Sequence, residues 1–116
     1  MRYALLIYNT PEVDQRSEAE QRRIAAGIYE VLARPNVTSW VRLRTVESAT
    51  TARHEQGRML LTDGPFVDSK DYLGGLIVVE VENIDGALSV VDELQELRGA
   101  GAIELRPLRE EDLGGA

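Results

Sequence analysis

Two short segments, residues 2–8 and 76–81, are apolar on both faces, and no other feature constrains the fold as strongly. Alternate residues of a strand point to opposite faces, so a strand with one buried face alternates between apolar and polar residues. Neither segment alternates: the first reads Arg-Tyr-Ala-Leu-Leu-Ile-Tyr and the second Leu-Ile-Val-Val-Glu-Val. We therefore expect both to be central strands of a sheet within one domain.

Two segments with helical periodicity lie between the predicted strands. Ser17 and Glu20 form a capping-box pattern, which predicts a helix over residues 18–32 that stops before Pro35. Asn83 is expected to cap a second helix, which the Gly99-Ala100-Gly101 sequence terminates. The stripes expected to face the core are Ile24, Ile28, Val31 and Leu32 in the first helix, and Ile84, Ala87, Leu88, Val91 and Leu94 in the second.

Further strands are predicted over residues 37–46 and around residues 103–105, where Pro107 ends the last one. A short hairpin is expected from residues 49–53 and 58–61, with Gly57 in its turn. The element order is then strand, helix, strand, inserted hairpin, strand, helix, strand. This order predicts an α+β protein of the ferredoxin-like βαββαβ type, with an antiparallel sheet and two helices on one face.

The predicted domain covers residues 1–108, and residues 109–116 read as a polar, acidic C-terminal tail. Two helices can cover only one face of the sheet, although the central strands are apolar on both. A second copy of the chain is the simplest cover for the other face. We therefore expect a homodimer that associates through the sheet.

A polar loop between two apolar runs carries the most distinctive motif, Asp63-Gly64-Pro65-Phe66. Gly tolerates positive φ and Pro fixes φ, so the adjacent pair predicts a turn. Asp68, Lys70 and Asp71 follow, and Gly74-Gly75 leads into the next strand. This series, with the opening strand and the closing Glu-Leu-Arg-Pro, resembles the YCII-related family, in particular its branch of DGPF-domain proteins.

The resemblance implies a dimeric α+β barrel, in which two sheets pair face to face. It also implies an accessory or signalling role, since DGPF proteins are often encoded near extracytoplasmic-function sigma factors. Some YCII-like proteins have a His in the first helix that pairs with an Asp as a proposed catalytic dyad. The helix predicted here over residues 18–32 contains no His, so the dyad is not transferred to this chain.

Composition narrows the possible partners. The net charge is −7, from 20 acidic and 13 basic residues, which argues against nucleic acid as a partner. There is no Cys, no phosphate-binding glycine loop and no His pair, so neither a metal nor a cofactor is expected. The opening apolar run is too short for a signal-peptide core or a membrane span, which predicts a cytoplasmic protein without a membrane partner.

Asp63 is the strongest candidate for a functional residue. Its carboxylate, at the end of a strand, suits a base or a polar anchor facing a pocket, but an Asp before Gly-Pro also accepts amides of its own loop as an Asx-turn. The sequence leaves both interpretations open. Other residues expected to bind a ligand beside Asp63 are Tyr8, Gly64, Phe66, Lys70 and Arg106.

Each of these candidates also has a structural interpretation. Phe66, the only Phe of the chain, is expected to hold the loop down as an apolar plug, and Lys70 to form a solvated ion pair. His54, the only His, falls at the predicted hairpin tip, where a general base has no shielded substrate. Trp40, Arg42 and Arg44 share one strand face and are expected to form a surface between subunits.

Two functions follow from the sequence. The first is a homodimer that binds a small polar or anionic metabolite beside the Asp63-Gly64-Pro65-Phe66 loop. The second is a cofactor-independent enzyme, such as a hydrolase, an isomerase or a dehydrochlorinase-like protein, with Asp63 as acid or base. The absence of a His in the first helix favours binding over turnover.

Overall fold

The computed structural model describes residues 1–113 and contains one four-stranded antiparallel sheet in the order β2-β5-β1-β6. Its strands are β1 (Arg2–Asn9), β2 (Val37–Arg42), β5 (Tyr72–Glu80) and β6 (Ala102–Pro107). The predicted ferredoxin-like order is confirmed, and the two doubly apolar segments lie in the central strands β1 and β5. Residues 114–116 of the predicted tail lie outside the described residues.

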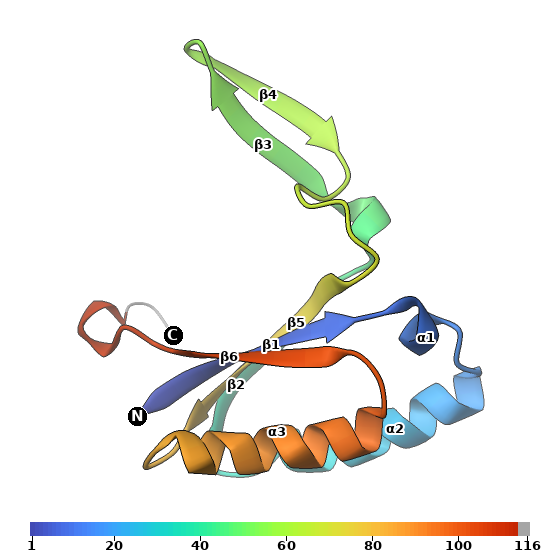
Figure 1. Ribbon diagram of the computed structural model, residues 1–116, viewed down its shortest axis with the longest axis vertical. Helices are drawn as coiled ribbons and strands as arrows, with labels where there is room; N and C mark the ends of the chain where they lie inside the picture. Colours follow the sequence, from blue (N-terminus) through green and yellow to red (C-terminus); the bar gives the residue numbers. More distant parts are fainter. Residues whose placement is uncertain (114–116) are drawn as a thin grey trace.

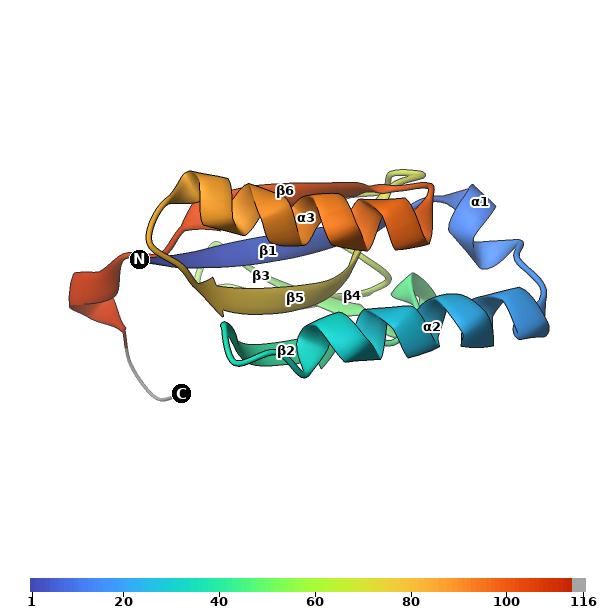
Figure 2. The same cartoon turned by 90° about the horizontal axis from the view of Figure 1, so that it is seen from below.

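Two long helices, α2 (Glu18–Leu32) and α3 (Ile84–Arg98), lie side by side on one face of the sheet (Figure 2). The core forms between these helices and the central strands. Alternation in β1 and β5 sends one set of side chains into this layer, as predicted for covered strands. The buried members of the core are Tyr3, Leu5, Val31, Leu32, Ile77, Val79, Ala87, Val90 and Leu94.

The predicted helix ends are confirmed. The Ser17 Oγ accepts a hydrogen bond from the Glu20 amide at 3.2 Å, and the Asn83 side chain accepts one from the Gly86 amide at 3.3 Å. Gly99 ends α3 with a φ of 67°, the left-handed conformation that favours glycine at this position. Both side chains cap the first turn of their helix, where backbone amides lack the usual carbonyl partner four residues earlier.

The stripe predicted for α3 is partly wrong. Ile84 and Leu88 are 51% and 45% exposed, whereas Val90 is buried. Successive helical residues are about 100° apart, so the line through Ala87, Val90 and Leu94 lies roughly a quarter turn from Ile84 and Leu88. The sequence pattern spans both lines, and only the line that faces the sheet is buried.

Strand β2 is shorter than the predicted strand over residues 37–46. The Leu43 amide still donates to the Gly74 carbonyl at 2.9 Å, but the chain then leaves the sheet and forms a short 3₁₀ turn, Val46–Ser48. Pairing stops there because β5 is irregular at the same point, where its register with β1 shifts between Ile7 and Tyr8. A second unpredicted element, α1 (Pro11–Asp14), follows β1.

Gly74 and Gly75 lie inside β5, which begins at Tyr72, so the prediction that they lead into the strand is wrong. Tyr72 and Leu73 already pair with Asn9 and Tyr8 of β1. A Cβ on Gly75 would lie 2.9 Å from the Val41 carbonyl oxygen, so this position requires glycine for close approach of β2.

The predicted hairpin is confirmed and consists of β3 (Thr50–Glu55) and β4 (Arg58–Asp63). Gln56 and Gly57, with φ of 50° and 75°, form its two-residue turn. Figure 1 shows the hairpin extending far from the sheet and away from the helices. The radius of gyration is 16.1 Å, against about 13 Å for a compact chain of this length.

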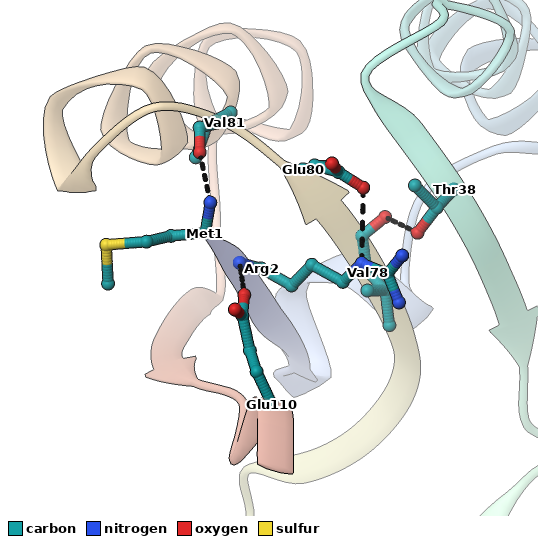
Figure 3. A network of polar contacts seen from close by, with 7 residues as sticks. All are labelled: Met1, Arg2, Thr38, Val78, Glu80, Val81 and Glu110. Carbon is teal, nitrogen blue, oxygen red and sulfur yellow. Dashed lines mark hydrogen bonds and ion pairs between the residues drawn. The ribbon is translucent and has the colours of Figure 1, made fainter. Parts of the chain in front are cut away.

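Polar contacts close the sheet at the end where Met1 and Glu110 lie (Figure 3). The Met1 amino group donates to the Val81 carbonyl at 2.8 Å, and the Arg2 amide donates to the Glu110 carboxylate at 2.7 Å. The Arg2 side chain also pairs with Glu80 at 3.2 Å. The Glu110 side chain therefore ties the segment after β6 to the start of β1.

The second face of the sheet carries Leu6, Leu76, Val78 and the half-exposed Val41, which oppose one another across β1, β5 and β2. Neither long helix covers this face (Figure 1). Within residues 1–113, no helix is both long enough and apolar enough to cross a membrane.

Candidate functional site

Two hollows lie at the Tyr8 end of the sheet. The helix–sheet cavity, of about 420 Å³, is partly open to solvent and is bordered by α1, α2, β2, the start of β5 and the end of α3. The loop groove has a volume of about 620 Å³. Its lining includes residues 65–67, which follow the hairpin, and Tyr8 and Leu73 of the sheet. Residues 43–45 and Tyr72 contribute to both hollows, so the two sites adjoin.

The helix–sheet cavity is rich in cations. Arg16, Arg42, Arg44 and Arg98 line it, and Asp14 is the acidic residue of its lining. Within residues 1–113, none of these four arginines forms an ion pair with a carboxylate. The cavity therefore carries an excess of positive charge although the chain as a whole is acidic.

Arg98 is the most unusual of these residues, because it is only 5% exposed. Its guanidinium donates to three neutral acceptors: the Tyr8 carbonyl at 2.8 Å, the Asn9 side-chain oxygen at 3.1 Å and the Gln95 side-chain oxygen at 2.6 Å. Burial, and then the charge of Arg16, lower the pKa of Arg98. The contacts fasten the end of α3 to the irregular end of β1.

Aromatic side chains also line the cavity. Tyr29 of α2 and Trp40 of β2 contact each other with ring centroids 5.6 Å apart, and Arg42 lies 3.4 Å from the Tyr29 hydroxyl. Trp40 pairs with Ile77, a core residue, so its strand face is the one that the helices cover. Trp40, Arg42 and Arg44, which the sequence predicts to form a surface between subunits, line this cavity within one chain, and their contact with a second subunit stays a prediction.

Tyr72 provides a hydroxyl at the mouth of the cavity. It donates to the Asp14 carboxylate at 2.5 Å. Burial, and then this hydrogen bond, raise the pKa of Tyr72 to about 12. Tyr72 therefore stays protonated at neutral pH and remains a hydrogen-bond donor.

The loop groove contains two of the predicted site residues, Tyr8 and Phe66. Phe66 is 71% exposed, and the Arg53 guanidinium lies over its ring at 5.8 Å. The expectation that Phe66 plugs the loop onto the domain is therefore wrong for the single chain. The ring instead belongs to an exposed apolar surface.

The other predicted residues lie apart from both hollows. Asp63 ends β4 and is exposed, and neither Lys70 nor Arg106 is among the residues lining either hollow. Gly64, with a φ of 102°, donates its amide to the Ala49 carbonyl at 2.7 Å and so closes the base of the hairpin.

The remaining charged candidates are also accounted for. Arg106 pairs with Glu104 at 2.6 Å, whereas Lys70 has no ion pair within residues 1–113. His54 is exposed beside the hairpin turn, as its structural interpretation predicts. The described part of the chain contains no group of three or more His, Asp or Glu side chains arranged to hold a metal.

Sequence reasoning missed Arg98, Asp14 and Tyr72. A signal for Arg98 was present, because it follows Leu94 by four residues and continues the buried line of α3. Asp14 and Tyr72 come together only through the fold, since 58 positions separate them in the chain. No local pattern announces their contact.

The four-stranded antiparallel sheet, with both helices on one face, defines a ferredoxin-like α+β protein. Within that class, residues 1–112 match the YCII-related domain, and the chain belongs to this family.

A curated relative is an uncharacterized protein of Rhizobium meliloti (strain 1021). It is 29% identical over 114 residues, which cover 93% of this chain and 92% of the relative. Similar solved structures include the divalent cation tolerance protein Cut A1 of Thermus thermophilus, at 18% identity and a TM-score of 0.41. That match covers 94% of this chain and 85% of the other. The periplasmic divalent cation tolerance protein CutA of Archaeoglobus fulgidus matches with the same coverage, at 16% identity and a TM-score of 0.37.

Proposed function

We propose that the protein is a homodimer that binds a small anionic metabolite in the helix–sheet cavity. The observation that carries this proposal is Arg98, a buried cation at the cavity wall with three neutral hydrogen-bond acceptors. The ligand class matches the anionic metabolite expected from the sequence. The site differs, because the charged groups gather beside α2 rather than beside Asp63.

Electrostatics support an anion. Buried charges in proteins are usually paired, because removing an ion from water is costly. Arg98 has no carboxylate partner within residues 1–113, and Arg16 and Arg42 add further positive charge to the same cavity. A bound anion would offset this charge, and arginine suits carboxylates because its planar fork can donate two parallel hydrogen bonds.

The apolar part of the cavity supports a ligand with a ring or a short hydrocarbon body. Tyr29 and Trp40 form an aromatic wall, and Ile24 and Ile28 of α2 also line the space. The volume of about 420 Å³ falls within the range of roughly 300–1,000 Å³ typical of small-molecule sites. A ligand with a carboxylate attached to a ring would pair its charge with the arginines and pack its ring against the aromatic side chains.

The homodimer is supported by the uncovered sheet face. Leu6, Leu76 and Val78 lie on it, and Val41 there is 54% exposed. Exposed apolar surface of this kind is typical of a protein interface. The role beside sigma-factor signalling and the cytoplasmic location stay predictions from the sequence.

The alternative, a cofactor-independent enzyme with Asp63 as acid or base, has less support. Asp63 is exposed and is not among the residues that line either hollow. General acid–base catalysis requires a residue within hydrogen-bond reach of a shielded substrate. Asp63 would need a second copy of the chain to provide that shield.

The proposal is tested by calorimetric titration of the protein with benzoate, and with acetate as the anion that lacks a ring. Benzoate is expected to bind and acetate to bind more weakly. Arg42→Gln and Arg98→Gln should each weaken benzoate binding about 10- to 100-fold, because a hydrogen bond to a charged group contributes roughly 1.5–3 kcal/mol. Arg42 is exposed, so its replacement leaves the core intact.

Arg22→Gln is the matched control, because Arg22 is an exposed arginine of α2 that does not line the cavity. Benzoate affinity should be unchanged in this variant. The proposal fails if the wild-type protein binds neither anion, or if Arg22→Gln weakens binding as much as Arg42→Gln does.

A further inference from the structure

We propose that the β3–β4 hairpin is an arm that packs against a second copy of this chain. The inference rests on the proposed homodimer and adds to it a contact that the sheet face alone would not provide. It assigns a role to a segment of the fold that has few contacts with its own domain.

The hairpin has almost no packing within its own chain. Every residue from Thr50 to Asp63 except Thr51 is exposed, and the two strands form a separate sheet from the main one. Figure 1 shows them standing clear of both layers of the domain. A two-stranded hairpin in water is marginally stable at best, so a segment with six paired positions is expected to gain stability from another surface.

The two faces of the hairpin differ in chemistry. On one face, Ala52 lies opposite Leu61 and His54 lies opposite Met59; the two apolar residues of β4 there are 63% and 64% exposed. The other face carries Arg53, Glu55 and Arg58 around Leu60, and Arg53 pairs with Glu55 at 3.2 Å. The face with Met59 and Leu61 is therefore the one suited to an apolar partner.

Apolar surface extends from the hairpin base to the uncovered sheet face. Phe66 and Val67, 71% and 68% exposed, line the loop groove together with Tyr8 and Leu73. Tyr8 and Leu73 pair across β1 and β5 and so connect this groove with the sheet. The interface that would hold two sheets together is thus continuous with the arm.

The extent of this surface fits a protein interface. Its half- to mostly exposed members are Val41, Leu43, Met59, Leu61, Phe66, Val67 and Leu73. Together they leave on the order of 700 Å² in solvent, close to the roughly 800 Å² that each partner buries in a standard interface.

Charge also permits a second copy as the partner. The chain has a net charge of −7, so two copies repel each other unless their contact surfaces are neutral. The hairpin face with Met59 and Leu61 carries one acidic residue, Asp63 at the base of the hairpin, whereas Arg53, Glu55 and Arg58 lie on the opposite face. On the sheet face, Glu104 is paired with Arg106 at 2.6 Å.

Excision of the arm provides the first test. The Gly64 amide donates to the Ala49 carbonyl at 2.7 Å, so the two ends of the hairpin are adjacent. Residues 50–63 can therefore be replaced by a two-residue Asn-Gly turn without moving the domain. Sedimentation velocity of the full chain is expected to give a dimer, and the shortened chain is expected to dissociate at least about tenfold more readily. Far-ultraviolet circular dichroism checks that the shortened chain remains folded.

The second test compares the two faces of the arm. Met59→Asp and Leu61→Asp should each weaken dimerisation about tenfold or more, because an unpaired carboxylate would be buried at the contact. Leu60→Asp, on the opposite face of the same strand, should leave the dimer nearly unchanged. All three residues are exposed in the single chain, so none of the substitutions is expected to unfold it.

The outcomes separate the arm from the homodimer itself. A full chain that is monomeric would overturn both. A dimer that persists with unchanged affinity after excision, or that loses affinity equally in Leu60→Asp and Met59→Asp, would overturn the arm and leave the homodimer standing. Benzoate binding measured on the same samples reports on the helix–sheet cavity independently.

Discussion

Gly75 lies where β2 approaches β5 most closely, and its replacement tests that contact. A Cβ there would lie 2.9 Å from the Val41 carbonyl oxygen, a backbone atom that cannot turn aside. Gly75→Val is therefore expected to lower the free energy of unfolding by about 1–3 kcal/mol, as overpacking does in other cores. Urea denaturation followed by circular dichroism measures this change.

Gly27→Ala is the control for a glycine whose neighbour is able to move. A Cβ on Gly27 would lie 2.7 Å from a terminal methyl of Leu97, at the end of a flexible side chain. Alanine also favours the interior of α2 by about 1 kcal/mol over glycine. The variant should be as stable as the wild type or slightly more so. If both variants lose equal stability, close backbone approach is not what Gly75 provides.

Tyr72 is expected to make the free energy of unfolding depend on pH in the alkaline range. The pKa of Tyr72 is raised from 10.0 to about 12, so between these values the folded state keeps a proton that the unfolded chain has lost. Folded protein then binds more protons than unfolded protein, and the free energy of unfolding falls as pH rises through this window. Tyr72→Phe should flatten that fall, as measured by urea denaturation at a series of pH values.

Asp14→Asn supplies the matched change for Tyr72. It removes the carboxylate, which is the second cause of the raised pKa, and leaves the burial, which is the first. The pKa of Tyr72 is expected to drop toward its ordinary value without reaching it, which the ultraviolet absorbance of tyrosinate records. An unchanged pKa would mean that the Asp14 contact is not formed in solution.

Single residues mark the limit of what the sequence could predict about the site. The burial of Arg98 could have been predicted, because helical spacing places this residue on the buried line of α3. The Asp14–Tyr72 contact could not have been predicted, since it depends on the path of α1, which no sequence pattern indicated. Asp63 attracted attention because its motif is distinctive, yet a distinctive turn fixes backbone direction and need not face a cavity.

The start of α3 depends on Asn83, and this dependence is an element-scale prediction. Its side chain accepts from the Gly86 amide at 3.3 Å, and this first-turn amide also donates to the Asn83 backbone carbonyl at 3.1 Å. Asn83→Ala should therefore lower the free energy of unfolding by about 1 kcal/mol. Asn83→Asp keeps the acceptor and adds a negative charge at the positive end of the helix dipole, so it should retain full stability. Thermal unfolding that ranks Asp with Ala would contradict a capping role.

The elements themselves were largely predictable because each has a local cause. Capping residues, apolar stripes and the Gln56-Gly57 turn set the ends of α2, α3 and the hairpin. The errors occur where tertiary contacts decide. The strand expected to reach residue 46 ends at Arg42 because its partner strand becomes irregular, and the direction in which the hairpin projects has no local signal at all.

For the whole molecule, the pattern of the central strands already indicated an uncovered apolar face. Ala4, Leu6 and Tyr8 alternate with the core residues Tyr3 and Leu5, and they lie on the side of the sheet opposite to the helices. The sequence could not indicate that the chain extends 46 Å along its longest axis, because that dimension comes from the projecting hairpin. A thin domain with an arm offers more surface to a partner than a compact one.

The uncovered face yields the last prediction. Val41 is 54% exposed there, so Val41→Asp costs the single chain little. In a dimer it would place a carboxylate in an apolar contact between two chains that each carry a net charge of −7. We expect the dissociation constant of the dimer to rise about tenfold or more. Added salt should recover part of the lost affinity, because it screens repulsion between the acidic copies.

Leu88→Asp, at a position of α3 that is 45% exposed, is the matched control, since the outer side of this helix faces away from the sheet. Equal sedimentation of the two variants at every concentration would mean that the dimer uses some other surface, and the helix layer would become the place to search for it.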